Sequence, residues 1–201
     1  MIDQKMAEWE NYVNSPSEAD PLIRMSLGHY QFEAIHPFDD GNGRTGRILN
    51  ILQLINDGVL SSPVLYLSRY IIAHKNEYYR LLRRVTSNED FTSWVEFMLN
   101  AVLTTAQPTL RLIDQIQQIE HEHKVTVSRV LPSGGTVTFI ETLMLQPYTR
   151  ITTVDRNCSA SRPTARKWLN SIAQEGFLTR VEIGWDVLYA SNQYMRTLTE
   201  A

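Results

Sequence analysis

The sequence is poor in cysteine. Its one thiol, Cys158, has no partner for an internal disulfide, and no histidine stands near it in the sequence. A lone cysteine of this kind is typical of a protein from a reducing compartment. A disulfide-stapled fold and a cysteine-based metal site are therefore excluded.

The chain also lacks a long apolar run. No stretch approaches the roughly 20 apolar residues that a transmembrane helix needs, and the first residues carry no apolar leader. We therefore expect no membrane partner and a cytoplasmic location. An excess of charge is missing too: 19 Lys and Arg against 22 Asp and Glu give a net charge of −3. The molecule as a whole thus has no basic footprint for nucleic acid.

What is present is an ordinary globular composition, in which 43% of residues are hydrophobic and 20% charged. Apolar residues at helical spacing predict helices over 3–13, 21–36, 48–55, 68–85 and 90–123. Asp20 is expected to cap the second helix, which Pro21 opens, and Pro37 ends it at His36. The third helix is apolar nearly all round, which predicts burial on several sides, and Pro108 is expected to interrupt the last. With no strand pattern before residue 125, this region is predicted to be an all-α bundle.

A second, smaller domain is predicted beyond the Pro-Ser-Gly-Gly segment 132–135, which is typical of a domain boundary. Helical patterns cover 137–145, 153–157 and 162–174. Two short alternating runs, 177–183 and 187–190, then flank a Gly-Trp-Asp turn and predict a β-hairpin. The expected architecture is mainly α: a helical bundle over 1–125, then a small winged helix-turn-helix (α+β) domain over 135–201.

Residues 36–47 concentrate the chemistry of the chain in a loop that enters a helix. Gly41 and Gly43 let the backbone turn sharply and approach a ligand, and Asn42 is placed to cap the helix. Asp40 offers a hard oxygen ligand suited to Mg²⁺, and the imidazole of His36 can accept a proton.

Arg44 and Arg47 follow in the first turn of that helix, three residues apart. Cations oppose the helix dipole there, so an anion is expected to offset the cost, and two guanidinium groups can clamp two phosphates. The loop therefore predicts a polyphosphate–Mg²⁺ site with a general base at one end. No strand precedes it and no Gly-Lys-Ser/Thr follows it, so it is not a P-loop.

These residues resemble the signature of the Fic (Fido) family, His-Pro-Phe-x-Asp/Glu-Gly-Asn-Gly-Arg-x-x-Arg, which residues 36–47 match without a mismatch. The flanks are similar as well, with His-Tyr-Gln-Phe-Glu-Ala-Ile at 29–35 and the pair Tyr78-Tyr79 further on. The resemblance covers roughly residues 3–103, and it implies a Fic-type helical bundle. A winged helix follows the Fic core in many bacterial members.

The resemblance implies transfer of AMP from ATP to a side-chain hydroxyl of a protein, the chain itself included, with release of pyrophosphate. His36 would be the base that deprotonates the hydroxyl, and Asp40 the Mg²⁺ ligand. Tyr78 would wall the adenosine pocket, with Thr86 a weaker candidate, and Phe38 would anchor the loop in the core. The remaining residues of the expected ATP site are Gly41, Asn42, Gly43, Arg44, Thr45, Gly46 and Arg47.

The resemblance also points to what this chain does not show. Family members carry a β-hairpin flap ahead of the His-Tyr-Gln-Phe-Glu segment, and many carry an inhibitory helix further upstream. We therefore expect the chain to be the C-terminal part of a longer Fic protein. Residues 171–176 fit the short pattern of the inhibitory helix, but Glu175-Gly176 is equally an ordinary helix stop.

Other functions remain open from the sequence. The chain could be a DNA-binding regulator whose Fic part senses nucleotide, with Arg162, Arg166 and Lys167 meeting phosphates. It could also be a catalytically silent remnant that needs a partner chain to supply the flap. A homodimer is a further possibility for its assembly. The loop recognises phosphates and says little about the base, so UMP or phosphoryl transfer stays an alternative to AMP transfer.

Overall fold

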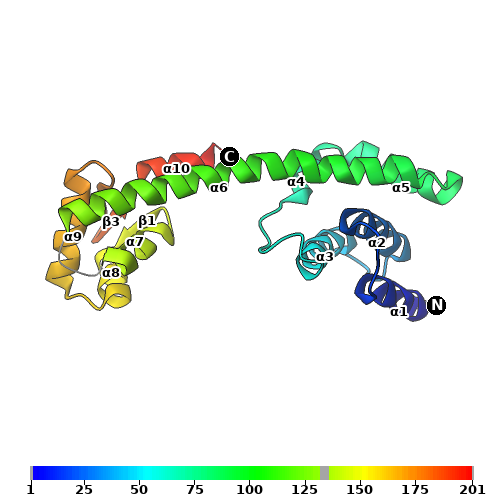
Figure 1. Ribbon diagram of the computed structural model, residues 1–201, viewed down its shortest axis with the longest axis horizontal. Coiled ribbons are helices and arrows are strands. Elements are labelled where there is room, and N and C mark those ends of the chain that lie inside the picture. Colours follow the sequence, from blue (N-terminus) through cyan, green and yellow to red (C-terminus); the bar gives the residue numbers. More distant parts are fainter. Residues whose placement is uncertain (1, 132–135, 201) are drawn as a thin grey trace. The chain divides into compact units, whose positions relative to one another are not determined.

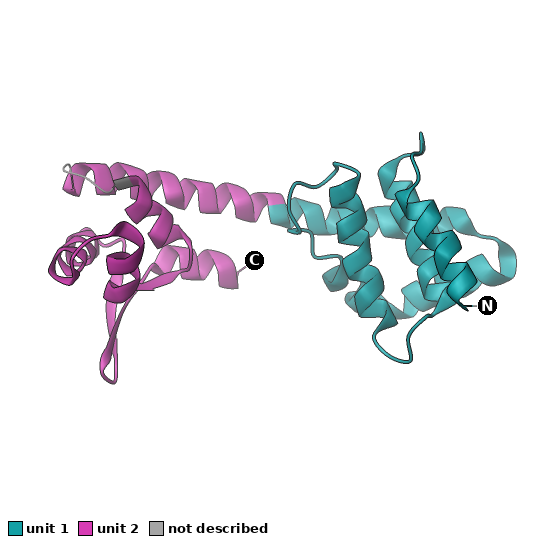
Figure 2. Ribbon diagram, turned by 90° about the horizontal axis from the view of Figure 1, so that it is seen from below, with its two compact units in different colours: residues 1–109 teal, residues 110–201 magenta. Residues whose placement is uncertain are grey.

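A computed structural model describes residues 2–131 and 136–200, leaving aside the side chain of residue 136. The chain divides into two compact units, Met1–Thr109 and Leu110–Ala201 (Figure 2). The predicted domain bounds, 1–125 and 135–201, stay a prediction, and the expected boundary at 132–135 lies outside the described residues. Among the helices described, none is both long and apolar enough to cross a membrane.

The first unit is all-helical, as predicted (Figure 1). It contains α1 (Ile2–Asn14), α2 (Pro21–Ile35), α3 (Asn42–Asn56), α4 (Leu67–Ala73), α5 (Lys75–Asn88) and the first part of α6 (Phe91–Val130). Asp20 caps α2 by accepting hydrogen bonds from the N–H groups of Leu22 and Ile23, as expected. Trp94 lies fully buried at the centre of the core and donates from Nε1 to the carbonyl of Ser26 at 2.7 Å. This bond ties α6 to α2, the helix that leads into the loop 36–47.

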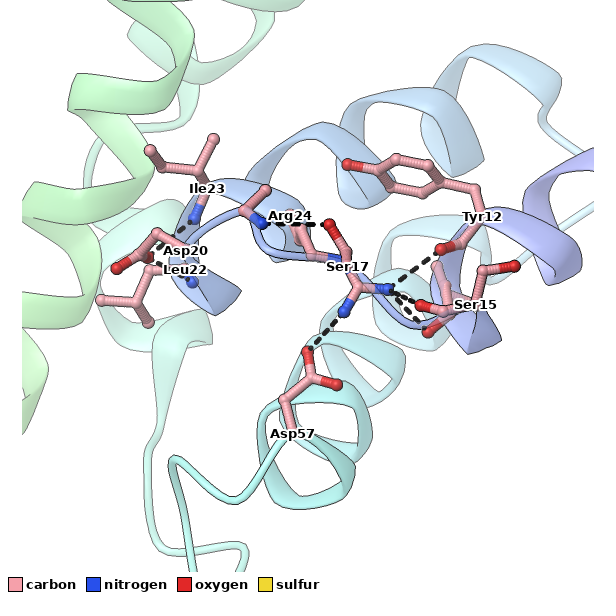
Figure 3. A network of polar contacts seen from close by, with 10 residues as sticks. Tyr12, Ser15, Ser17, Asp20, Leu22, Ile23, Arg24 and Asp57 are labelled. Atoms are coloured by element: carbon pink, nitrogen blue, oxygen red, sulfur yellow. Dashed lines mark hydrogen bonds and ion pairs between the residues drawn. The ribbon is translucent and has the colours of Figure 1, made fainter.

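A buried arginine joins the N-terminal helices to the end of α3 (Figure 3). Arg24 is 6% exposed, and its guanidinium donates to the carbonyls of Tyr12 at 3.1 Å and Ser15 at 2.9 Å. The same group faces Asp57, 3.6 Å away, just beyond α3. Because a buried charge is tolerated only when it is paired and hydrogen-bonded, this network fixes α1, α2 and α3 together.

The structure corrects the expectation that the apolar third helix is buried on several sides. Ile48 and Leu52 are 60% and 54% exposed. The buried stripe of α3 instead repeats every fourth residue, and it is made of Asn42, Gly46, Asn50 and Leu54. Three of these four are polar or lack a side chain, so the core-facing stripe of the helix is the less apolar one. This stripe contacts polar groups: Asn42 bonds the backbone of the loop, and Gly46 lies against polar side chains of α2.

Two helix boundaries also differ from expectation. The predicted helix 68–85 is broken at His74, whose backbone leaves the α region (φ −111°, ψ 31°) and whose ring stacks on Tyr70 with centroids 4.0 Å apart. No glycine or proline marks that break. Conversely, α6 continues through Pro108, although proline in a helix interior costs about 3 kcal/mol. The expected interruption at Pro108 is therefore wrong. Core residues of the first unit, such as Ala101, precede Pro108 on this helix, and core residues of the second unit, such as Val127, follow it.

The second unit combines the rest of α6 with short helices and a small sheet. It contains α7 (Thr136–Met144), β1 (Tyr148–Arg150), α8 (Ile151–Cys158), α9 (Arg162–Gln174), β2 (Thr179–Ile183), β3 (Asp186–Ala190) and α10 (Asn192–Thr199). The strand order is β1-β3-β2, and both pairings are antiparallel. The three predicted helices and the hairpin are present, whereas β1 and α10 were not anticipated. A mainly α fold with a small α+β part is therefore confirmed; its assignment as a winged helix stays a prediction.

Glu175 follows α9 as its C-cap, and Gly176 has φ 82°. The Glu175 carboxylate pairs with Arg129 of α6, with Nη2 and Oε2 2.5 Å apart. Gly in the left-handed region is a common way to end a helix. The segment 171–176 therefore has the structure of the ordinary helix stop, with its glutamate engaged inside the second unit.

Candidate active site

The loop begins where α2 stops. His36 takes a left-handed conformation (φ 53°, ψ 60°), and its N–H donates to the carbonyl of Phe32 at 3.0 Å. A residue before proline is disfavoured in the right-handed α region, so Pro37 ends the helix at this residue as predicted. The histidine is thereby placed at a chain turn beside the cavity described below.

The side chain of Asn42 holds the loop closed. Its Oδ1 accepts from the N–H of Phe38 at 2.9 Å and its Nδ2 donates to the Phe38 carbonyl at 2.6 Å. Asn42 was expected to cap α3, but it is the first residue of the helix and points back into the loop. Phe38 was expected to anchor the loop in the core, yet its side chain is 49% exposed, with its ring 6.3 Å from that of Phe32. The loop is therefore anchored through the backbone of Phe38, which the buried side-chain amide of Asn42 binds with two hydrogen bonds.

Gly41 is the actual N-cap of α3. Its φ of 85° lies in the left-handed region that favours glycine. The first bond of the helix runs from the N–H of Thr45 to the Gly41 carbonyl at 2.9 Å. The N–H groups between these residues have no partner in the helix and carry the positive end of its dipole. The glycine turn thus directs several donors toward the same side.

The two arginines are held differently. Arg44 is 75% exposed in its side chain and lies 3.5 Å from Asp40, itself 93% exposed. An exposed pair of this kind contributes little, about 0–1 kcal/mol, so both groups can reorient toward a ligand. Arg47 is fixed more firmly, because its Nε donates to Ser68 Oγ at 2.9 Å. Ser68 belongs to α4, so the second arginine depends on a residue far along the chain.

These groups surround one open cavity of about 570 Å³. Most of the predicted site lines it, namely His36, Asp40, Gly41, Asn42, Gly43, Arg44, Arg47 and Tyr78. Residues outside the predicted site complete the wall: Glu33, Asp39, Ile71, Ile72, Lys75, Tyr79 and Leu82. Thr45 and Gly46 are not among the lining residues. The cavity thus has two ends. Residues of α4 and α5 form its more apolar end, and the start of α3 forms its polar end.

Gly46 instead lies where the helix passes close to α2. A methyl group added there would come within 2.8 Å of Glu33 Oε1 and 3.0 Å of His29 Cε1. The second glycine of the Gly-Arg-Thr-Gly-Arg segment is therefore a packing requirement. It lets α3 approach α2 closely enough to place Arg47 beside the cavity.

The two tyrosines of α5 have separate positions. Tyr78 is 3% exposed, and its hydroxyl lies 2.9 Å from Nε2 of His29. Burial, followed by the charge of Glu33, raises the pKa of Tyr78 above its ordinary value, so the phenol stays neutral. Tyr79 is 46% exposed and lines the cavity, and the Lys75 ammonium lies over its ring, 5.9 Å from the centroid. The spacing of Lys75 and Tyr79, four residues apart on one helix, was the available signal for this wall.

The remaining candidate, Thr86, is not among the residues that line the cavity. Its hydroxyl is engaged with that of Tyr30 on α2, 3.1 Å away.

A buried histidine contacts Tyr78 behind the wall of the cavity. His29 is 2% exposed and stacks on Trp94 with ring centroids 6.0 Å apart and an interplanar angle of 6°. Burial and then the charge of Arg47 lower the pKa of His29 to about 4. The ring is therefore neutral at neutral pH and serves as a structural partner for Tyr78, distinct from His36 at the cavity surface.

Glu33 is the least expected charged group at the site. One carboxylate oxygen, Oε1, is buried and has no hydrogen-bond partner among the described residues. Burial raises the pKa of this carboxyl, while the nearby charges of His36 and Arg47 lower it. The net direction of the pKa is upward, and the side chain lines the cavity one helical turn before His36.

In the second unit, the predicted phosphate-contacting residues Arg162, Arg166 and Lys167 are all exposed on α9. The buried side of that helix is made of Ala165, Leu169 and Ile172. Arg162 forms an ion pair with Asp155 of α8 at 3.4 Å, which offsets part of its charge. The three cations thus share the solvent side of one helix, and one of them is already paired.

Two models of known protein families match parts of this sequence. The Fic/DOC family model matches residues 1–54, which include α1, α2, the whole loop and nearly all of α3. The first quarter of the chain is therefore similar to the Fic/DOC family. A second model, described as the protein adenylyltransferase SoFic-like C-terminal domain, matches residues 119–194.

Several curated Fic relatives are similar over parts of the chain. Protein adenylyltransferase Fic of Drosophila yakuba is 31% identical over 105 residues, which are 52% of this chain and 20% of that protein. The relative from Aedes aegypti is 28% identical over 131 residues, 64% of this chain and 24% of that protein. A probable protein adenylyltransferase of Aquifex aeolicus is 38% identical over 63 residues, covering 31% and 20%. The chain spans about a fifth of the length of these relatives.

A solved structure of a Fic family protein from Desulfovibrio desulfuricans G20 has a similar fold. The match has a TM-score of 0.52 and 24% sequence identity, and it covers 95% of this chain and 55% of that one. At this identity the likeness concerns the fold alone. The match extends over both units of the chain.

Proposed function

We propose that this chain is a protein adenylyltransferase, which transfers AMP from ATP to a side-chain hydroxyl of a protein. The observation that carries the proposal is the shared cavity of His36 and the start of α3. A base, a set of helix N–H donors and two guanidinium groups face one space, and an aromatic and aliphatic wall closes the other end. This arrangement suits a nucleoside bound to a polyphosphate.

In the proposed reaction, the target hydroxyl oxygen attacks the α-phosphorus of ATP while His36 accepts the hydroxyl proton. The bond from the α-phosphorus to its bridging oxygen breaks, and pyrophosphate leaves. Negative charge on the phosphates is met by the N–H groups at the start of α3 and by Arg47, which Ser68 holds in place. Arg44, free to reorient from Asp40, supplies the second clamp.

The residues fit a magnesium ion brought with the nucleotide. No group of three or more His, Cys, Asp or Glu side chains that could hold a metal occurs among the described residues. Mg²⁺ at nucleotide sites is bound by one or two carboxylates together with phosphates and water. The exposed carboxylate of Asp40, at the mouth of the anion loop, would hold it. The ion would supply charge neutralisation at the phosphates.

The wall on α4 and α5 would bind the adenine base of ATP, because it is largely apolar and carries an aromatic ring. Tyr79 and Lys75 offer a ring face and an ammonium group, and Ile71, Ile72 and Leu82 add apolar wall. Tyr78 contributes from a buried position, with its hydroxyl already bound to His29. The base therefore meets mostly apolar surface.

A direct test uses ATP labelled on the α- or the γ-phosphate, with the purified chain and a cell lysate as the source of targets. Label from the α-phosphate in protein, lost in His36→Ala, is the expected result. Label in protein from the γ-phosphate alone would indicate phosphoryl transfer and contradict AMP transfer. A parallel reaction with labelled UTP separates AMP from UMP transfer.

Contact with DNA through α9 remains a second prediction. It rests on the exposure of Arg162, Arg166 and Lys167, which is a small electrostatic footprint. Replacing Arg166 and Lys167 by Ala should then weaken a salt-sensitive gel shift, and an unchanged shift would remove the prediction. The expected cytoplasmic location and the alternative of a partner that completes the site also stay predictions.

A further inference from the structure

The strand β2 is an edge strand that is open to solvent along its whole length. In the sheet order β1-β3-β2 it pairs only with β3 among the described residues. All five of its residues, 179–183, are exposed. An edge strand keeps a row of N–H and C=O groups that can pair with another strand. This edge lies in the second unit and has no part in the site proposed above.

The charges on β2 have an order that favours its own antiparallel copy. Arg180 and Glu182 flank Val181, and their side chains form an ion pair along the strand at 2.6 Å. If β2 pairs antiparallel with a second β2 around a twofold axis at Val181, Arg180 of each chain lies opposite Glu182 of the other. Directly opposite residues point to the same face and lie close enough to interact. The symmetric pairing therefore creates two cross-strand ion pairs.

Neighbouring symmetric registers lack this match. Centring the pair on Arg180 places two arginines opposite each other, and centring it on Glu182 opposes two glutamates. Like charges directly opposite are destabilising. Many proteins protect an edge with charges of one sign, whereas the charges here are of opposite sign and self-complementary in one register. The strand thus specifies both the partner and the alignment.

An apolar stripe lies on the other face of the same strand. Val181 stands opposite Leu188 of β3, and Ile183 stands next to the turn. Both are exposed, and Trp185 at the tip of the hairpin is fully exposed. In the register centred on Val181, the two valines lie side by side. Pairing therefore continues this apolar stripe from one sheet into the next.

From these features we propose that β2 is a self-association surface, which pairs antiparallel with β2 of a second copy of this chain. The product is a symmetric six-stranded sheet with Val181 at its centre. The interaction is limited to one short strand and its side chains. Interfaces smaller than about 1,200 Å² are characteristic of weak, transient complexes, so the dimer forms in a concentration-dependent manner.

Charge exchange between two variants tests the pairing. Arg180→Glu opposes glutamates, and Glu182→Arg opposes arginines, so each variant alone should associate about tenfold or more weakly than the native chain. A mixture of the two restores both ion pairs, and so does the double variant Arg180→Glu/Glu182→Arg. Sedimentation velocity of the full chain over a range of concentrations measures each case. Arg156→Glu, at an exposed position of α8, is the matched control and should behave as the native chain.

Recovery in the mixture is the decisive result, because damaged folding cannot explain association that two separately monomeric variants regain together. Three results would overturn the proposal: a native chain that stays monomeric at every concentration, an Arg180→Glu variant that associates as the native chain does, or a mixture that does not associate. If the edge instead contacts DNA, Arg180→Glu should weaken a gel shift without any change in sedimentation, which also overturns it. These outcomes are independent of AMP transfer by the first unit.

Discussion

The side-chain amide of Asn42 closes a two-bond ring with the backbone of Phe38, accepting from its N–H at 2.9 Å and donating to its carbonyl at 2.6 Å. The residue that begins α3 thereby fixes the loop that follows His36. His36 and the start of α3 are therefore held in one geometry before any ligand arrives. Such preorganisation is what a transfer reaction requires.

We predict that Asn42→Ala lowers both stability and nucleotide binding. The variant leaves the Phe38 N–H and carbonyl without their buried partner, which costs about 1–3 kcal/mol per unsatisfied group. Thermal unfolding and ATP titration measure the two effects. Asn100→Ala, whose amide bonds only a carbonyl of its own exposed helix turn, is the control. Unchanged ATP binding in Asn42→Ala would contradict the role of the ring.

Gly46→Ala should destabilise the first unit by about 1–3 kcal/mol, because the methyl group meets Glu33 and His29 where two helices approach closely. The matched control is Gly28→Ala in α2. There the added methyl group makes ordinary contacts at 3.4 Å, and alanine is the better helix former by about 1 kcal/mol. Urea unfolding of both variants decides the matter. Equal stability of the two would show that the close approach has no such cost.

The buried His29 gives stability a defined pH dependence. Its folded pKa of about 4 is below the ordinary 6.5, so between these values the unfolded chain takes up a proton that the folded chain does not. The stability linked to His29 is therefore complete above pH 6.5 and declines as the pH falls toward 4, by about 3 kcal/mol in total.

His29→Gln tests this dependence. The variant should show a shallower loss of unfolding free energy between pH 6.5 and 4 than the native chain. His123, whose pKa burial also lowers, remains in both proteins and cancels in the difference. Parallel profiles for the native chain and the variant would refute the assignment to His29.

Ser68→Ala should weaken ATP binding several-fold without loss of the fold. The hydroxyl holds Arg47 through one hydrogen bond to a charged group, and such a bond contributes about 1.5–3 kcal/mol. An exposed serine that bonds its own helix, Ser87, provides the control variant Ser87→Ala. Isothermal titration with ATP and Mg²⁺ is the measurement. Equal affinity in the two variants would mean that Arg47 does not need this support.

The loop could be predicted from the sequence because its chemistry is local. His36, Asp40, Arg44 and Arg47 lie within twelve consecutive residues, so any fold that forms the loop brings them near one another. The cap at Asp20 and the helix end at His36, set by the following proline, were equally local, and both were predicted.

Positions that depend on packing between helices were not predictable in the same way. The periodicity of α3 suggested burial of its isoleucines and leucines, but contact with α2 selects the stripe that contains Gly46 and Asn50. The same cause separates Tyr78 from Tyr79: Tyr78 is buried with its hydroxyl beside His29, Tyr79 is half-exposed, and both line the cavity. Ser68 reaches Arg47 only through the fold. The strand β1 has three residues, which is too short for an alternating pattern to identify it.

The central claim is that His36 is the base of an AMP transfer that this chain carries out. Its most direct test is the intact mass of the purified chain, alone and with lysate proteins, after incubation with ATP and Mg²⁺, beside His36→Ala. The account predicts an AMP adduct on the chain or on a lysate protein with the native chain, and none with the variant, while both bind ATP. An adduct of equal yield with His36→Ala, or no adduct from a native chain that binds ATP, would contradict it.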